Sequence, residues 1–269
     1  ARATGTWGGE RREVGDPLEV IARSEAEAAV VAETGETNRN DGRWFETTVT
    51  RPFLFHGSIG PAAAVAQWDS GDVTVWSHSQ GVFQLRQAMS QALGLPENRI
   101  SVIHHAGAGC YGHNGADDAA FDAVLMARAV PGRPVKVVWS RADEFRAAPM
   151  GPGMATTARA LLAPDNRILA VDVTVNSAPH ANRPGSNGTP NLRAAAYIAS
   201  PVPPARSTDL PLARGGGADR NAVPGYAIPN VRVRKRLVHD LPYRTSSLRS
   251  LGAFTNVLAI ETLLDDIAL

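Results

Sequence analysis

The sequence predicts a mixed α/β fold (α+β in character) in which mixed sheets are joined by crossover helices. Two pairs of strand-like runs, within residues 62–77 and 155–176, are each separated by a short turn sequence, as in β-hairpins. A third region, residues 99–139, has the order strand, loop, helix and strand, which is typical of a parallel crossover. With 269 residues, 43% of them hydrophobic, the chain is large enough for one substantial domain or two modest ones.

The N-terminal part is predicted to contain a helix, a linker and a strand. Residues 16–33 are rich in Ala and Glu and begin with Asp-Pro, which favours a helix. Residues 34–43 are polar with two glycines, as linkers are, whereas residues 44–55 are rich in Thr, Val and Phe, as strands are. We therefore expect residues 1–44 to be the end of a preceding segment with a linker, and residues 45–269 to form the main domain.

The first hairpin and the crossover follow one another. The hairpin strands are expected at residues 62–68 and 73–77, and a helix at residues 82–93, which Gly94 ends. The crossover then needs a strand before the glycine-rich loop and a second strand at residues 134–139. Between them a helix with a regular apolar face is expected, capped by Asp117 or Asp118.

The C-terminal part combines a hairpin, an irregular stretch and a helix. The second hairpin is expected at residues 155–163 and 168–176. Residues 178–230 are rich in Pro, Gly, Asn and Arg, with one short helix expected at 191–199. An irregular stretch of this length is usually functional or wraps a partner. Residues 245–269 show helical spacing of apolar residues and predict one long amphipathic helix.

Composition excludes several functional classes. The net charge of +1 gives no global field that would attract nucleic acid. The basic run Arg232–Arg236 partly alternates with apolar residues, so it predicts a solvated strand face rather than a nucleic-acid patch. The single cysteine rules out an internal disulfide framework, and no apolar run approaches the roughly 20 residues of a membrane span.

The two ends of the sequence indicate a piece of a longer polypeptide. The chain starts without an initiator Met or a signal peptide, and it stops on an apolar helix without a glycine cap or polar tail. We therefore expect sequence to continue beyond Leu269. No targeting segment is visible that would assign the chain to a compartment.

The most informative stretch is the glycine-rich loop Gly107–Asp118. Four glycines in nine residues leave a bare backbone that a ligand can approach closely, which predicts the wall of a cofactor site. The spacing fits neither the P-loop nor the dinucleotide-binding glycine motif. Because two aspartates occupy the tip of the following helix, we expect any anion to lie on the loop amides around Gly109–Gly112.

Cys110 within this loop has two interpretations. It is either a nucleophile, with His113 three residues away and His104 and His105 nearby, or a small residue packed against a cofactor. The seven histidines form neither HxH nor HExxH, so no protein-ligated metal is predicted.

Two further segments have the composition of a binding site. Ser77-His-Ser-Gln-Gly81 lies between a strand and a helix, where the Gln80 amide either donates to a ligand oxygen or belongs to an ordinary helix start. Arg244-Thr-Ser-Ser-Leu-Arg-Ser-Leu-Gly252 is either an anion clamp or a capped helix start with exposed arginines.

Together these segments resemble the molybdopterin-binding large subunit of the xanthine dehydrogenase/aldehyde oxidase family of molybdenum hydroxylases. The resemblance runs from about Phe45 to Leu269 and includes a GRPVK…RxDE-like segment at residues 132–144. It is strongest to the nicotinate dehydrogenase B-subunit type, through Gly109-Cys-Tyr-Gly-His-Asn-Gly-Ala-Asp-Asp118 and Gly215-Gly-Gly-Ala-Asp-Arg-Asn-Ala222. It implies that the chain is the first part of such a molybdopterin-binding domain.

The resemblance also implies roles for single residues. Gln80 would hydrogen-bond an oxygen ligand of molybdenum or the pterin, the loop backbone would lie against the metal's ligands, and Arg249 would help to hold the pterin or the substrate. Tyr111 stands where most relatives have Phe, and Leu251 stands where a substrate-stacking aromatic often lies. The cofactor-binding residues expected on this basis are Gln80, Gly109, Cys110, Tyr111, Gly112 and Arg249.

The implied cofactor is molybdenum-molybdopterin, in the pterin cytosine dinucleotide form. [2Fe-2S] clusters and a haem are expected on partner subunits, namely an iron–sulfur small subunit and a c-type cytochrome. The expected reaction is hydroxylation of an N-heteroaromatic, nicotinate-like substrate or an aldehyde, with water as the oxygen source.

No catalytic residue is assigned, because the family's base Glu, in a Gly-x-Gly-Glu motif, is expected outside this chain. The isolated chain is therefore expected to be inactive. The alternatives are a non-catalytic binding domain of a larger complex and a cysteine-dependent hydrolase.

Overall fold

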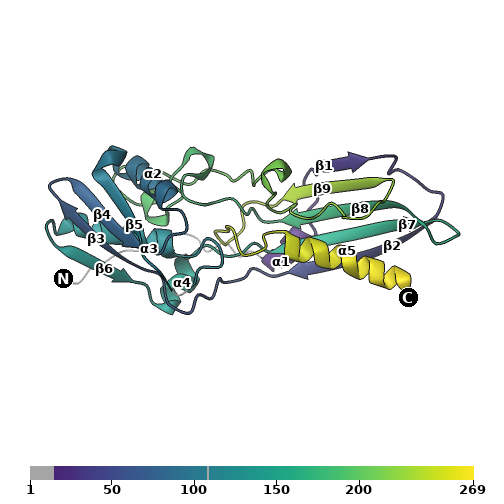
Figure 1. Ribbon diagram of the computed structural model, residues 1–269, viewed down its shortest axis with the longest axis horizontal. Coiled ribbons are helices and arrows are strands. Elements are labelled where there is room, and N and C mark those ends of the chain that lie inside the picture. The colour runs from purple at the N-terminus through teal and green to yellow at the C-terminus, as the bar shows by residue number, and fades with distance from the viewer. Residues whose placement is uncertain (1–14, 108) are drawn as a thin grey trace.

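The computed structural model describes residues 15–107 and 109–269, and it shows an elongated molecule with one β-sheet in each of two lobes (Figure 1). The smaller sheet has the strand order β5-β4-β3-β6 and the larger sheet the order β1-β9-β8-β7-β2. Each sheet contains one parallel pair, β4–β5 and β8–β9, and its other pairs are antiparallel. The prediction of a mixed α/β fold with mixed sheets is therefore confirmed.

Helices cover one face of the smaller sheet. Its core consists of alanines and branched residues of α2 and α3 packed on the strands, with Phe121 fully buried at the centre. The strands are β3 (Ala63–Asp69), β4 (Asp72–Ser77), β5 (Ile100–His104) and β6 (Pro134–Val138). The helices are α2 (Val82–Leu93), the 3₁₀ turn Glu97–Arg99, α3 (Ala116–Ala129) and α4 (Arg141–Ala147).

The larger sheet packs its inner face on the C-terminal helix, drawn in yellow in Figure 1. Its strands are β1 (Ala29–Thr34), β2 (Arg43–Arg51), β7 (Met154–Leu162), β8 (Ile168–Ser177) and β9 (Val231–Leu237). The helices of this lobe are α1 (Pro17–Ala22) and α5 (Ala253–Ala268). Three 3₁₀ turns, Ser186–Gly188, Arg193–Ala196 and Leu212–Arg214, are the helical parts of the long connection from β8 to β9.

Both predicted hairpins are present, and the predicted crossover is present in a modified form. Strands β5 and β6 run in the same direction, but β4 and β3 lie between them. The parallel strands that are neighbours are β4 and β5, which α2 connects.

Three predicted helices were wrong in part. Helix α1 ends at Ala22, and Ala29–Thr34 instead form strand β1, which pairs with β9. The helix predicted from residue 245 begins only at Ala253, because Ser250 and Leu251 adopt positive φ angles of 73° and 53° that no α-helix contains. The predicted helix at 191–199 is a 3₁₀ turn at Arg193–Ala196.

The basic strand β9 is less solvated than predicted. Arg232 and Arg234 both bond to the carboxylate of Asp172 on β8, which is almost completely buried. Their half-buried guanidinium groups therefore belong to an ion-pair network across the sheet. In the part of the chain that the structure describes, no helix is long and apolar enough to cross a membrane.

Candidate cofactor site

The glycine-rich loop follows β5 and reaches α3 through a backbone that glycine makes possible. Gly109 and Gly112 have φ angles of +94° and +131°, and Tyr111 between them has a φ of +57°. A Cβ atom at residue 112 would lie 2.2 Å from the carbonyl oxygen of Ser247, closer than any packing allows. The bare backbone predicted for this loop is thus required at Gly112 by both conformation and close approach. Residue 108 lies outside the described residues.

The loop is paired with the segment that precedes α5. The His113 N–H donates to the Ser247 carbonyl at 2.8 Å, and the Arg249 N–H donates to the Tyr111 carbonyl at 2.7 Å. These two bonds form an isolated antiparallel bridge between Gly112 and Leu248. Two segments about 135 residues apart in the sequence therefore form one short two-stranded wall.

Gln80 extends from the end of β4 toward the same loop. Its Nε2 donates to the Cys110 sulfur at 2.7 Å, and its Oε1 accepts a hydrogen bond of 2.8 Å from the Arg183 guanidinium. Because Arg183 occupies the amide oxygen, the amide NH₂ group must face the loop. The structure therefore presents an oriented donor beside the loop backbone.

A buried polar cluster lies beneath this wall. Asp117 accepts from the Ser79 hydroxyl and lies 3.1 Å from His113 Nε2, and His113 Nδ1 lies 2.9 Å from the Ser246 hydroxyl. Burial raises the pKa of Asp117, but hydrogen bonding and charge from His113, together with the Ser79 hydrogen bond, outweigh burial and lower this pKa overall. The loop thus rests on an ionised, buried carboxylate.

The predicted capping role of the aspartates was wrong. Helix α3 begins after Gly115 with no side-chain cap, and both carboxylates are buried. Asp118 accepts from the Arg193 backbone N–H at 2.8 Å and from the Arg244 guanidinium. Arg244 is therefore a structural ion-pair partner of α3, and it does not start the last helix.

The structure brings most of the predicted site residues together. Gln80 contacts Cys110, and Arg249 bonds to Tyr111 through its backbone, with its side chain exposed. Leu251 is half-buried, and its carbonyl accepts from Arg51 at 2.8 Å. These contacts show where the residues lie. That they bind a cofactor stays a prediction.

Histidine contacts bear on the nucleophile interpretation of Cys110. The two ring nitrogens of His113 contact Ser246 and Asp117, and His104 Nδ1 lies 3.1 Å from the Ser79 carbonyl oxygen. The hydrogen-bond partner of the Cys110 sulfur is the Gln80 amide, which is not a base.

Sequence reasoning missed Arg183, which fixes the Gln80 amide. It comes from the irregular stretch between β8 and β9, where no periodic pattern marks single positions. The signal that could have pointed to this stretch is its length, because long irregular stretches are usually functional. Burial lowers the pKa of Arg183, and the charge of Asp117 acts in the opposite direction.

A glycine-rich backbone wall, an oriented amide donor and the side chains of Arg183 and Arg249 are features expected of a cofactor-binding domain. Backbone amides and a neutral NH₂ donor are groups that suit oxygen ligands and a polar ring system. The chain belongs to the molybdopterin cofactor-binding domain family, whose model matches residues 21–197.

Relatives of known activity share this domain. The chain is 35% identical over 219 residues to the nicotinate dehydrogenase B-subunit of Pseudomonas putida, a match that covers 81% of this chain and 17% of that protein. It is 33% identical over 97 residues to the aldehyde oxidoreductase molybdenum-binding subunit PaoC of Escherichia coli, a match that covers 36% of this chain and 13% of that protein. The chain therefore spans less than a fifth of these relatives' length.

Solved structures share the fold. The aldehyde oxidoreductase of Desulfovibrio desulfuricans superposes with a TM-score of 0.69 at 15% identity, over 97% of this chain and 28% of that chain. Quinoline 2-oxidoreductase of Pseudomonas putida superposes with a TM-score of 0.60 at 19% identity, over 94% of this chain and 28% of that chain.

Proposed function

We propose that this chain is part of the molybdenum-cofactor-binding subunit of an oxidoreductase. The reaction would be hydroxylation of an N-heteroaromatic, nicotinate-like substrate or an aldehyde, with water as the oxygen source. The single observation that carries this proposal is the Gln80 amide, which Arg183 orients toward the Gly109–Gly112 backbone. Family membership and the likeness to the nicotinate dehydrogenase B-subunit support it.

The residues of this chain would bind and orient. Gln80 Nε2 would exchange its bond to Cys110 for one to an oxygen ligand of the cofactor, and the amides of residues 109–112 would lie against the same group. Arg249, whose side chain is exposed, would hold the pterin or the substrate, and Leu251 would contact the substrate. When bound, the molybdenum-molybdopterin cofactor supplies the two-electron redox centre for the hydroxylation.

Other parts of the enzyme would complete the reaction. We propose that residues 45–269 belong to the first part of the molybdopterin-binding domain, which would also include strand β1 because β1 pairs with β9. The catalytic Glu would lie in sequence outside this chain. The cofactor would be the cytosine dinucleotide form. A [2Fe-2S] small subunit and a haem-bearing c-type cytochrome would accept the electrons.

A second candidate is a non-catalytic, cofactor-free binding domain of a larger complex. One observation favours it: Asp117, the carboxylate beneath the loop, is buried and engaged with His113 and Ser79. It is therefore not free to act as a base.

The test compares Gln80→Ala with Gln91→Ala in the assembled enzyme complex that contains this chain. Gln91 is an exposed glutamine on α2 whose amide bonds only to Gly188 among the described residues. We expect Gln80→Ala to lower turnover of nicotinate or an aldehyde at least 100-fold, or to lower the molybdenum content, because a positioned donor of this kind contributes about 3 kcal/mol. Gln91→Ala should leave both unchanged. A complex without molybdenum, or one in which both variants stay fully active, would refute the proposal.

A further inference from the structure

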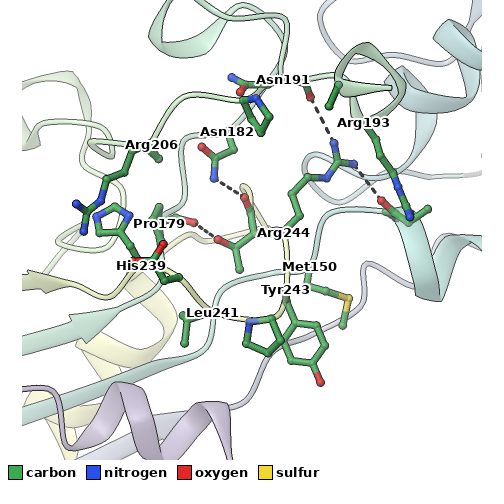
Figure 2. Close-up of a pocket in the computed structure, with 18 of the residues that line it drawn as sticks. Met150, Pro179, Asn182, Asn191, Arg193, Arg206, His239, Leu241, Tyr243 and Arg244 are labelled. Carbon is green, nitrogen blue, oxygen red and sulfur yellow. Dashed lines mark hydrogen bonds between the residues drawn. The ribbon is translucent and has the colours of Figure 1, made fainter. Parts of the chain in front are cut away.

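A cavity open to solvent lies beside the candidate cofactor site. It has a volume of about 680 Å³ and is lined mainly by residues of α4, of the segment 191–207 and of the segment 238–245. In its wall the Asn182 side-chain amide donates to the Thr245 carbonyl at 2.8 Å, and Figure 2 shows the position of Asn182. The volume falls in the range of about 300–1,000 Å³ that small-molecule sites occupy.

The cavity carries excess positive charge. Arg146, Arg193 and Arg206 line it and form no ion pair within the described ranges 15–107 and 109–269, although Arg193 donates to the Arg146 carbonyl at 3.1 Å. Figure 2 shows Arg206 beside His239 on one side of the cavity and Arg193 on the other, with Arg244 between them. Asp118 neutralises the charge of Arg244. Among the described residues that line the cavity, the acidic one is Asp240, which is exposed. Three arginines without a carboxylate partner therefore line a concave space, which favours an anionic ligand.

His239 does not add to this charge at neutral pH. Burial first, and then the neighbouring Arg206, lower the pKa of His239, against an opposite effect of Asp240. The ring is therefore neutral at pH 7, where it can accept or donate a hydrogen bond.

Aromatic rings complete the lining. Phe145, Tyr197 and Tyr243 are 59%, 81% and 46% exposed, although large aromatic side chains are usually covered. All three border this cavity. Exposed rings beside arginines that lack an ion-pair partner suit a flat ligand, because a ring stacks on the aromatic side chains while its charged group reaches the guanidinium groups.

We propose that this cavity binds an aromatic anion, a flat ring that carries a carboxylate or a phosphate. The anionic group pairs with Arg193 at one side of the cavity or with Arg206 at the other, and Tyr197 and Tyr243 contact the ring. The site uses neither Gln80 nor the glycine-rich loop, so it is independent of the proposed function.

Titration calorimetry of the full chain with four small probes tests the ligand class. Benzoate and phenyl phosphate carry a ring and an anionic group, benzamide is the neutral counterpart of benzoate, and acetate lacks the ring. We expect benzoate or phenyl phosphate to bind at least tenfold more tightly than benzamide and acetate, and the tighter of the two identifies the anionic group. Equal affinity for benzoate and benzamide, or no binding of either anion, overturns the proposal.

Variants locate the ligand. Either Arg193→Gln or Arg206→Gln should weaken binding of the tighter anion about tenfold, because it removes a charge-assisted contact, and the variant that does so marks the side of the cavity that holds the anionic group. Tyr197→Ala should weaken it several-fold. Arg133→Gln, an exposed arginine outside the cavity lining, is the matched control. Circular dichroism checks that each variant is folded. If Arg249→Gln weakens binding and the cavity variants do not, the anion occupies the candidate cofactor site and this proposal fails, whereas absence of molybdenum from the enzyme would leave it standing.

Discussion

Gly112 shows how a single residue lets two distant segments form one wall. Its φ of +131° and its approach to the Ser247 carbonyl both exclude a Cβ atom. We expect Gly112→Ala to lower the free energy of unfolding by about 3 kcal/mol or more, because backbone strain and a clash with backbone add together. Urea denaturation measures this change. Gly94→Ala is the control: Gly94 also has a positive φ, +66°, but nothing lies within 4 Å of its added Cβ, so its cost should be only about 1 kcal/mol. Equal costs would show that the contact with Ser247 is not tight.

His180 makes stability depend on pH. It is fully buried, and burial, followed by the charges of Arg51 and Lys235, lowers its pKa well below the usual value. The folded protein therefore holds this ring neutral while the unfolded chain protonates it near pH 6.5. Its effect on stability is constant above that pH and becomes unfavourable as the pH falls toward the folded pKa.

The expected slope is up to about 1.4 kcal/mol per pH unit below about pH 6.5 for this one group. Denaturation of the protein and of His180→Gln between about pH 7.5 and 5.0 measures it. The variant should lose less stability over this range than the unmodified protein, whereas His105→Gln, at an exposed position, should change the pH dependence little. Parallel pH profiles for His180→Gln and the unmodified protein would contradict the assignment.

The sequence singled out the residues of the candidate site, but it did not predict the contacts that hold them in place. Gln80 and the loop stand out because strand ends and glycine runs are local signals. Arg183 bonds to Gln80, which lies 103 positions away in the sequence, and no local pattern around Arg183 predicts this contact. Likewise, no local pattern around Ser247 predicts its bond to the distant His113. The two aspartates were predicted as caps, whereas in the structure they are buried and have tertiary contacts, Asp117 with Ser79 and Asp118 with Arg244.

At the scale of elements, the composition of the turns predicted both hairpins correctly, whereas helix propensity predicted a helix where the structure has strand β1. The β3–β4 and β7–β8 hairpins form where short polar turns join strand-like runs. In contrast, the Ala- and Glu-rich run at 25–33 has strong helix propensity, yet residues 29–34 pair with β9, some 200 positions away. Propensity amounts to a few tenths of a kcal/mol per residue, so pairing on a sheet edge can outweigh it.

Asn256 fixes α5 to the larger lobe. Its side chain is fully buried, accepts from the Thr156 hydroxyl at 2.8 Å and donates to the carbonyls of Ala218 and Arg220 at 2.8 and 2.9 Å. We expect Asn256→Ala to lower the free energy of unfolding by about 3 kcal/mol, because it leaves buried polar groups unpaired. Phe254→Ala on the same helix removes a side chain that is 56% exposed and should cost under about 1 kcal/mol in the same urea titration. A similar small cost for both would mean that water replaces the Asn256 contacts.

At the scale of the whole molecule, the sequence could not give the strand order. In both sheets other strands lie between two strands that are consecutive in the chain: β9, β8 and β7 separate β1 from β2, and β4 and β3 separate β5 from β6. Such an order depends on which edges remain free when the strands meet, a non-local property. The fold class followed from local patterns, whereas the two-lobed arrangement in Figure 1 depends on long connections that carry no periodic signal.

The Asp118–Arg244 ion pair attaches the C-terminal segment to the smaller lobe. Asp118 belongs to α3 and is almost fully buried, whereas Arg244 precedes α5 and also donates to the Ala147 carbonyl at the end of α4. Breaking the pair leaves an uncompensated buried charge, so Arg244→Gln should cost about 3 kcal/mol or more. A double-mutant cycle with Asp118→Asn should give a coupling energy of about 2 kcal/mol, measured by urea denaturation. The exposed pair Arg167–Asp165 is the matched control, and its coupling should stay below about 0.5 kcal/mol. Equal coupling in the two cycles would mean that solvent screens the Asp118 contact and that the backbone bridge at Gly112 carries the attachment of the segment.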